Sequence, residues 1–165
     1  GINTGRPNRL VEEALTANAI PELTGYSSHR REVKYGQNSR IDVLLEEPGR
    51  APLYLEVKNV HLMRRPGFAE FPDSVTARGA KHLDELAEMV RLGHDAAMFF
   101  VVQRNDCQAL TLAADIDANY AAAMQRALAA GVRILCYSSR ISTTEIVIER
   151  RLPFVWQGVE KDSRY

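Results

Sequence analysis

The stretch from Ile41 to Lys58 reads IDVLLEEPGRAPLYLEVK and contains two apolar segments joined by a turn centred on Gly49. Nearly continuous apolar runs of this length are typical of strands that are covered on both faces of a sheet. Burying a charge in such a place is costly unless it is paired. The charged residues inside these segments, Asp42, Glu56 and Lys58, therefore need an explanation.

The spacing of these three residues brings them together in a hairpin. Glu56 and Lys58 are two apart, so both side chains project from the same face of a strand. Asp42 and Glu56 are each seven residues from Gly49, so a hairpin that turns there places them directly opposite each other. Opposed residues have Cβ atoms roughly 5 Å apart. The two carboxylates then repel each other unless a cation lies between them or one of them is protonated.

A divalent cation suits this pair of carboxylates. Mg²⁺, or Mn²⁺ in its place, prefers oxygen ligands of this kind. Lys58, next to such a cation, can orient or help to deprotonate an attacking water and offset charge on a scissile phosphate. The alternative is an antiparallel sheet whose Asp, Glu and Lys face solvent. The charge pattern alone favours this alternative, whereas the apolar flanks favour a metal-dependent phosphodiesterase site.

Basic residues lie in two clusters that flank the proposed site in sequence. The net charge is zero, with 21 basic and 21 acidic residues, so no global field draws the chain to nucleic acid. A local basic patch beside a cleavage site would track phosphates. The alternative is that each cluster is a solvated face. The first cluster is Arg30, Arg31, Lys34 and Arg40, and the second is Lys58, Arg64, Arg65, Arg78 and Lys81.

The periodicity of the rest of the chain predicts one α/β domain. A length of 165 residues with 45% hydrophobic composition is typical of a single domain with its own hydrophobic core. Helical and strand patterns alternate, which implies right-handed crossovers onto a parallel part of a sheet. We therefore expect a mixed central sheet flanked by helices over residues 1–155, and a loosely ordered tail over 156–165. The segment from His61 to Thr76 lacks a clean period and is predicted as a long loop.

Other polar residues are secondary candidates. On the helix that follows Pro7, Glu12 lies at the edge of the apolar face, and Glu13 lies nearly opposite that face. His82 can touch phosphate from the next helix, although a packed or surface histidine is the simpler interpretation. Gln103 and Arg104 end a central strand, where open sheets place ligands.

The ordered set of motifs resembles a known family. The order of these motifs resembles the PD-(D/E)XK nuclease superfamily: a helix carries Glu12, a strand carries Asp42, and the next strand carries Glu56-Val57-Lys58. The wider set of sequence motifs over residues 1–155 resembles the sugar fermentation stimulation protein A family. The segments that carry this resemblance are PNRLVEE (7–13), SRID (39–42), EVKNV (56–60), FPDSVTARG (71–79), KHL (81–83) and VQR (102–104).

The resemblance implies a restriction-endonuclease-like α/β fold and a DNA-binding protein with a nuclease-like domain, linked by name to sugar (maltose) metabolism. Metal ligation then falls to Asp42, Glu56 and the carbonyl of Val57, with Glu12 in support and Glu13 in reserve. Family members carry a small N-terminal OB-like β-barrel, and we expect it to be absent from this chain.

Three classes of function compete. The first is a Mg²⁺-dependent nuclease acting on nucleic acid, with DNA as the preferred partner. The second is a DNA-binding or regulatory module without significant catalysis; it would gain little from two facing carboxylates that repel DNA. The third is an α/β enzyme of another kind, for which we find no phosphate loop, Gly-rich fingerprint or nucleophile triad.

The cysteines and the apolar stretches of the sequence indicate the cellular compartment of the protein. Cys107 and Cys136 show no metal-binding spacing, and the four histidines form no zinc motif, so a reduced, cytoplasmic setting is the simple interpretation. No apolar stretch reaches the roughly 18 residues of a membrane span, and no membrane partner is expected.

Overall fold

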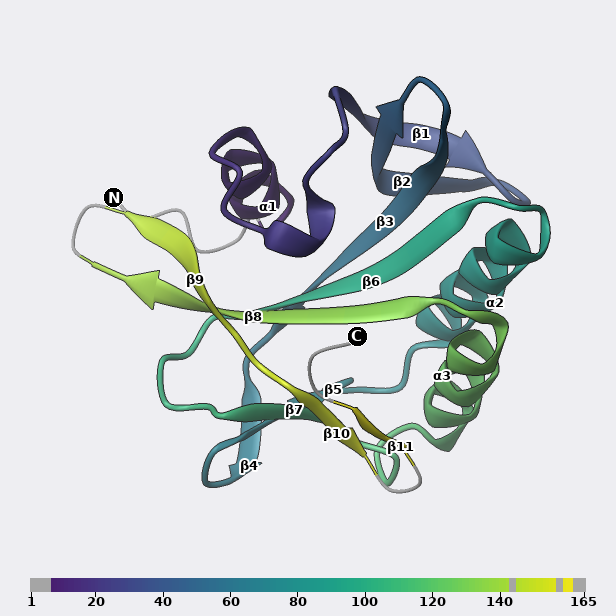
Figure 1. Ribbon diagram of the computed structural model, residues 1–165. Helices are drawn as coiled ribbons and strands as arrows, with labels where there is room; N and C mark the ends of the chain where they lie inside the picture. The colour runs from purple at the N-terminus through teal and green to yellow at the C-terminus, as the bar shows by residue number, and fades with distance from the viewer. Residues whose placement is uncertain (1–6, 143–144, 157–158, 162–165) are drawn as a thin grey trace.

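The computed structural model describes residues 7–142, 145–156 and 159–161, which form a six-stranded mixed sheet with flanking helices (Figure 1). The strand order is β1-β2-β3-β6-β8-β9. The strands are β1 (Ser28–Tyr35), β2 (Ser39–Glu47), β3 (Arg50–Val60), β6 (Asp95–Val102), β8 (Arg133–Ile141) and β9 (Ile146–Arg151). The helices are α1 (Pro7–Thr16), α2 (Ala77–Arg91) and α3 (Ala118–Ala130), with a short 3₁₀ turn at Pro21–Leu23. The predicted α/β fold with a mixed central sheet is confirmed.

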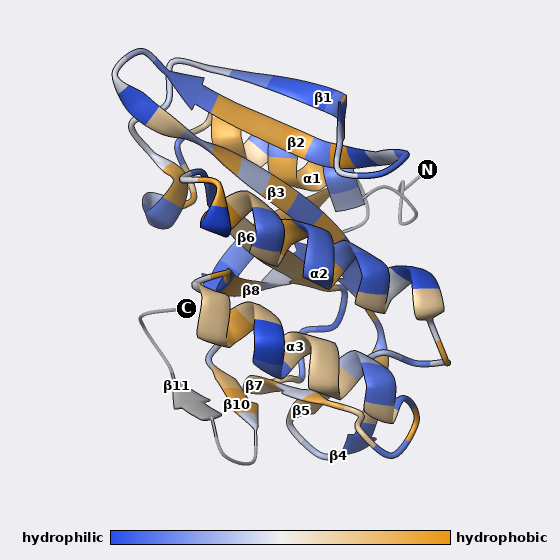
Figure 2. Ribbon diagram, turned by 90° about the vertical axis from the view of Figure 1, so that its right-hand side faces the viewer, coloured by the Kyte–Doolittle hydropathy of each residue, from blue (hydrophilic) through white to orange (hydrophobic). Residues whose placement is uncertain are grey.

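The helices cover both faces of this sheet. α1 lies on one face, and α2 and α3 lie on the other (Figure 1). β3, β6 and β8 run parallel, whereas β1, β2 and β9 join antiparallel. Phe99 of β6 packs in the core under α1, and Phe100 packs in the core under α2 and α3. The central strand β6 is therefore apolar from Ala96 to Val102, while the edge strand β1 is mostly hydrophilic (Figure 2).

Capping residues fix where α2 and α3 begin. Thr76 Oγ1 accepts a hydrogen bond from the backbone N–H of Gly79 (2.9 Å), and Asp117 Oδ1 accepts one from that of Tyr120 (3.0 Å). These bonds satisfy amides that have no partner inside the helix. Asp117 also accepts from the backbone N–H of Thr76 (2.8 Å). The starts of the two helices are thus joined to each other.

A second, five-stranded sheet was not predicted. Its strands lie in the order β11-β10-β7-β5-β4. The prediction of a long loop from His61 to Thr76 is wrong, because this segment forms a hairpin that turns at Gly67, whose φ is 84°. β5 then pairs in parallel with β7, far along the chain. The strands are β4 (Leu62–Arg65), β5 (Phe68–Phe71), β7 (Ala109–Leu112), β10 (Phe154–Trp156) and β11 (Val159–Lys161).

The predicted tail, residues 156–165, is described only in part. Trp156 ends β10, and β11 pairs antiparallel with β10. Residues 157–158 and 162–165 lie outside the described part of the chain.

No helix in the described residues has the length and apolar character needed to cross a membrane.

Candidate metal centre

β2 and β3 separate at the point where Asp42 and Glu56 lie. Their ladder pairs Val43 with Leu55, as the predicted turn at Gly49 requires. Beyond this pair β2 continues along β1, and β3 continues along β6. The backbone N–H of Val57 donates to Asp42 Oδ2 at 2.7 Å, so a side chain takes the place of a ladder partner. The carboxylate of β2 is thereby held against β3 where the two strands fork.

The second oxygen of Asp42 is bonded from α1. Asn8 Nδ2 donates to Asp42 Oδ1 at 3.1 Å. Burial, followed by the charge of Glu56, raises the pKa of Asp42, and the bonds from Val57 and Asn8 and the charge of Lys58 only partly offset this rise. Ionisation of Asp42 beside the charged Glu56 is thus unfavourable, and a cation or a proton relieves the repulsion.

Glu56 is buried, with 3% of its surface exposed. Its Oε2 lies 3.2 Å from Lys58 Nζ and 3.2 Å from His82 Nδ1. The histidine contact has ion-pair distance but not hydrogen-bond geometry. Burial alone would raise the pKa of Glu56, but His82 and Lys58 together hold it below its usual value. Glu56 therefore stays ionised, and its Oε1 is buried without a hydrogen-bond partner in the described part of the chain.

Two buried phenols lie close enough to feel this charge. Burial, and then the negative charge of Glu56, raises the pKa of both Tyr35 and Tyr120, which keeps them neutral. Neither hydroxyl has a hydrogen-bond partner among the described residues.

The donor set fits a hard divalent cation. Asp42 and Glu56 supply carboxylate oxygens. Glu56 Oε1 has no hydrogen-bond partner among the described residues and is free to bind a cation. Over residues 7–142, 145–156 and 159–161, no group of three or more His, Cys, Asp or Glu side chains is placed to hold a metal. Two carboxylates suffice for Mg²⁺, which commonly keeps several waters and binds substrate phosphate directly. The ligand role of the Val57 carbonyl stays a prediction.

The helix glutamates are placed differently from each other. Glu12 faces the sheet, as predicted, and its oxygens lie 3.5 Å from His29 Nε2 and 3.4 Å from Arg31 Nε on β1. Glu13 is exposed and pairs with Arg9 on its own helix. A supporting role for Glu12 at the metal stays a prediction.

Asn8 is a site residue that the sequence interpretation missed. It lies one helical turn before Glu12, so both residues share the face of α1 that looks toward the sheet. Its bond to Asp42 joins residues far apart in the chain. The spacing to Glu12 was the available signal, but asparagine carries no charge that would single it out.

The first basic cluster lies along β1 and the start of β2. Arg30 pairs with Glu46 at 2.9 Å, and Arg40 donates to the backbone carbonyl of Glu32 at 3.2 Å. Lys34 is exposed. This edge of the main sheet is therefore basic but partly neutralised.

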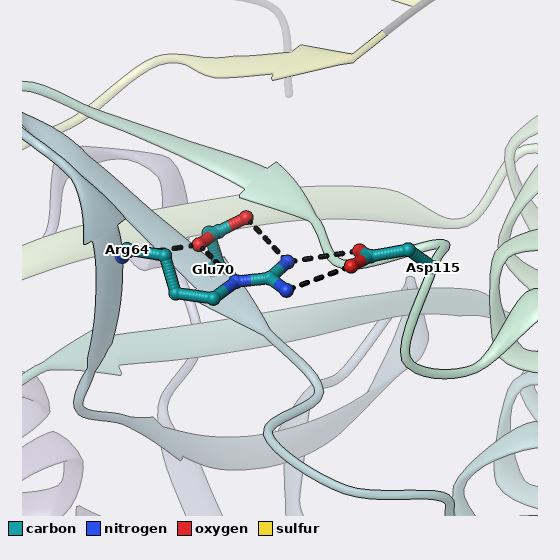
Figure 3. A network of polar contacts seen from close by, with 3 residues as sticks. All are labelled: Arg64, Glu70 and Asp115. Carbon is teal, nitrogen blue, oxygen red and sulfur yellow. Dashed lines mark hydrogen bonds and ion pairs between the residues drawn. The ribbon is translucent and has the colours of Figure 1, made fainter.

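The second cluster is spread over several parts of the fold. Arg64, on β4, is held by Glu70 (2.9 Å) and by Asp115 (2.7 Å), as Figure 3 shows. The guanidinium of Arg65 lies 4.5 Å from the centroid of the Phe68 ring. Both arginines belong to the second sheet. Arg64 is already occupied by two carboxylates, so it is a poor phosphate ligand.

Two more members of this cluster lie at the start of α2. Arg78 is exposed, and Lys81 Nζ donates to the carbonyl of Gln37 at 3.0 Å. The same helix carries His82, which is 6% exposed and contacts Glu56. His82 is therefore a residue of the carboxylate site and not a surface phosphate contact. α2 connects the basic surface to the buried site.

The remaining candidates lie at the end of β6. The backbone N–H of Gln103 donates to the carbonyl of Val60 (3.0 Å), and its side-chain nitrogen is buried without a partner among the described residues. Arg104 pairs with Asp106 at 2.8 Å. Their contacts are with the ends of neighbouring elements and do not reach the carboxylate pair.

Comparison with known proteins gives similarity to one family. A family model described as the sugar fermentation stimulation protein RE domain matches residues 5–145. A "Sugar fermentation stimulation protein homolog" of Agrobacterium fabrum is 55% identical over 148 residues, which are 90% of this chain and 62% of that protein. One of Dinoroseobacter shibae is 56% identical over 153 residues, or 93% of this chain and 63% of that protein.

A solved structure has the same fold. It is that of Pyrococcus furiosus SfsA in complex with Ca²⁺, with a TM-score of 0.83 and 26% sequence identity. The match covers 92% of this chain and 65% of that one. The chain thus spans less than two thirds of the length of each of these three proteins.

Proposed function

Because the chain belongs to the sugar fermentation stimulation protein family, we propose that it is the nuclease-like part of a DNA-binding protein that hydrolyses phosphodiesters with Mg²⁺ or Mn²⁺. The family resemblance read from the sequence motifs is confirmed. The observation that carries the proposal is geometric: Asp42 and Glu56 lie just beyond the last ladder pair of β2 and β3, close enough for the charge of Glu56 to raise the pKa of Asp42, and a buried Glu56 oxygen is unengaged. The Ca²⁺ complex of the Pyrococcus furiosus protein supports a divalent cation of the same oxygen-seeking class.

Each residue of the site has a proposed role. Asp42, Glu56 and the carbonyl of Val57 hold the cation, which when bound supplies Lewis-acid stabilisation of the phosphate. Lys58, paired with Glu56 at 3.2 Å, orients a water and offsets negative charge on the scissile group. Val57 and Asn8 fix the direction of the Asp42 carboxylate by donating to its two oxygens.

The proposed partner is DNA, bound through phosphates. Lys34 on β1 and Arg78 on α2 are exposed, and no ion pair within the described residues engages either of them. Both come from elements that border the carboxylate site.

We assign the cytoplasm as the location because Cys107 and Cys136 are free thiols. The link to sugar (maltose) metabolism follows the family name and is part of the proposal.

One observation favours a second function, a DNA-binding or regulatory module without significant catalysis. Lys58 already pairs with Glu56 at 3.2 Å, so the site can persist as a buried ion pair without any metal cation. Such a protein would bind DNA in EDTA and leave it intact.

Incubation with nucleic acids separates the two functions. Single- and double-stranded DNA and RNA are treated with the purified protein in Mg²⁺, Mn²⁺ or EDTA. Metal-dependent cleavage that disappears in Asp42→Ala and in Lys58→Ala, and persists in Asp84→Ala on the exposed face of α2, is the expected result. Uncut nucleic acid together with EDTA-resistant retention on a DNA column would establish the binding module instead.

A further inference from the structure

The two oxygens of Glu56 have unequal surroundings. Lys58 Nζ and His82 Nδ1 both approach Oε2 at 3.2 Å, whereas Oε1 is buried without a hydrogen-bond partner in the described chain. We propose that His82 is a positioning residue, which with Lys58 holds Oε2 and so turns Oε1 toward the cation. This inference rests on the proposed function, and it adds a residue from α2 to a site built by β2 and β3.

His82 is held firmly enough to act in this way. Its ring is buried in the first half of α2, whose start is capped by Thr76 and joined to α3 through Asp117. The helix also lies close to its neighbour at Gly79, where an added Cβ would sit 2.9 Å from Thr76 and 3.1 Å from Tyr120. The start of α2 is therefore anchored to α3, and from this anchored helix the imidazole reaches Glu56 of β3.

The contact is worth keeping because a carboxylate has two equivalent oxygens that can exchange places by rotation. Leaving a buried oxygen without a partner costs free energy. Because Lys58 Nζ and His82 Nδ1 both lie 3.2 Å from Oε2, the rotation that would present this oxygen to the metal is opposed. Partners of this kind orient metal ligands, and their loss typically lowers metal affinity by about 10–100-fold.

Three substitutions of His82 test the assignment by direct measurement of Mn²⁺ binding with calorimetry. His82→Leu removes the ring nitrogens. His82→Asn presents its amide nitrogen near the position of Nδ1, and His82→Gln presents it near the position of Nε2. We expect near-normal affinity for His82→Asn and a loss of about 10-fold or more for the other two. His94→Leu is the control and should bind normally, because His94 lies just before β6 and packs its ring on that of Tyr54.

The outcomes separate this inference from the function on which it rests. Wild-type affinity in His82→Gln or His82→Leu would overturn the role of His82 while leaving the metal site intact. Wild-type protein that takes up no Mn²⁺ would overturn the proposed function, and the inference with it. If His82→Leu shows no cooperative thermal transition in EDTA, the comparison of His82→Asn with His82→Gln decides, because both place an amide at the buried position.

Discussion

At the scale of single residues, Asp42 combines two duties that usually belong to different groups. It accepts the hydrogen bond of a backbone amide, as a carbonyl does in a regular ladder, and it lies close enough to Glu56 for the two charges to interact. Its raised pKa comes from burial first and from the charge of Glu56 second. A metal cation and a proton thus compete for the carboxylate of Asp42.

Stabilisation by a divalent cation should therefore depend on pH. Because the pKa of Asp42 is raised above its ordinary 3.8, the protonated form favours the folded state, and this contribution is lost as pH rises through the folded pKa. Mn²⁺ should then raise the Tm more at about pH 7.5 than at about pH 5, where protons compete. Calorimetry with and without Mn²⁺ measures both shifts. Asp42→Asn should show neither, and an equal shift at both pH values would contradict the assignment.

Asn8→Ala should weaken the fold through one hydrogen bond. The variant loses the bond from Nδ2 to Asp42 Oδ1, and we expect the free energy of unfolding to fall by about 1 kcal/mol. Urea denaturation measures it. The control is Arg9→Ala, the next residue of α1, which loses only an exposed pair with Glu13 and should cost below about 0.5 kcal/mol. Equal losses would show that the bond from Asn8 contributes nothing specific.

The sequence predicts part of this site because part of it is local. The turn at Gly49 and the two-residue period of a strand are enough to oppose Asp42 to Glu56 and to place Lys58 beside it. Asn8 and His82 reach the same carboxylates from helices far along the chain. Their contacts depend on how α1 and α2 pack, and no local pattern records that.

At the scale of elements, one arginine joins three segments of the second sheet. Arg64 of β4 contacts Glu70 of β5 and Asp115, which follows β7 (Figure 3). Glu70 is 5% exposed, and its contact with Arg64 lowers its pKa. The network thus keeps a buried carboxylate ionised and binds the hairpin to the rest of the sheet.

Arg64→Met should destabilise the second sheet. Glu70 would remain buried without its counter-charge, and we expect a Tm lower by on the order of 5 °C near neutral pH. Because the lowered pKa of Glu70 stabilises the fold above its ordinary 4.5 and not below its folded pKa, the difference from wild type should shrink in acid. Calorimetry measures both effects.

A second substitution separates the loss of charge pairing from the loss of packing. Arg64→Met/Glu70→Gln should recover part of the Tm, because the unpaired buried carboxylate is gone. Arg126→Met, which breaks an exposed pair with Asp84, is the control for losing a bidentate arginine and should lower the Tm less. No recovery in the double variant would assign the effect of Arg64 to packing.

The same sheet marks the limit of prediction for elements. The long strands and the three helices follow from periods that extend over many residues. β4 and β5 have four residues each; β5 pairs with β7 from later in the chain, and β7 pairs in turn with β10. A strand this short shows no period of its own. The segment from His61 to Thr76 was therefore predicted as a loop, although Gly67 marks its turn.

At the scale of the whole molecule, zero net charge makes DNA binding a property of one surface. Of the basic candidates, Arg30, Arg64 and Arg104 are engaged by carboxylates. Exposed Lys34 and Arg78 lie on elements that border the site. Binding should accordingly be weak over most of the surface and concentrated near the fork.

Removing the positively charged side chains of Lys34 and Arg78 should lower both the affinity for DNA and the salt dependence of that affinity. For Lys34→Ala/Arg78→Ala, the slope of log K against log salt should fall by about 1 for each lost phosphate contact. Fluorescence anisotropy in EDTA measures binding without cleavage. Arg126→Ala on α3 is the matched control. An equal effect of the control would place the DNA elsewhere on the molecule.

The fork between β2 and β3 has a practical consequence for following the protein in solution. The amide of Val57 donates to a carboxylate and not to a carbonyl, at 2.7 Å. Its proton chemical shift and its rate of hydrogen exchange should thus follow the ionic state of Asp42. A single backbone resonance therefore offers a spectroscopic reporter of occupancy at the site, readable without substrate and without turnover.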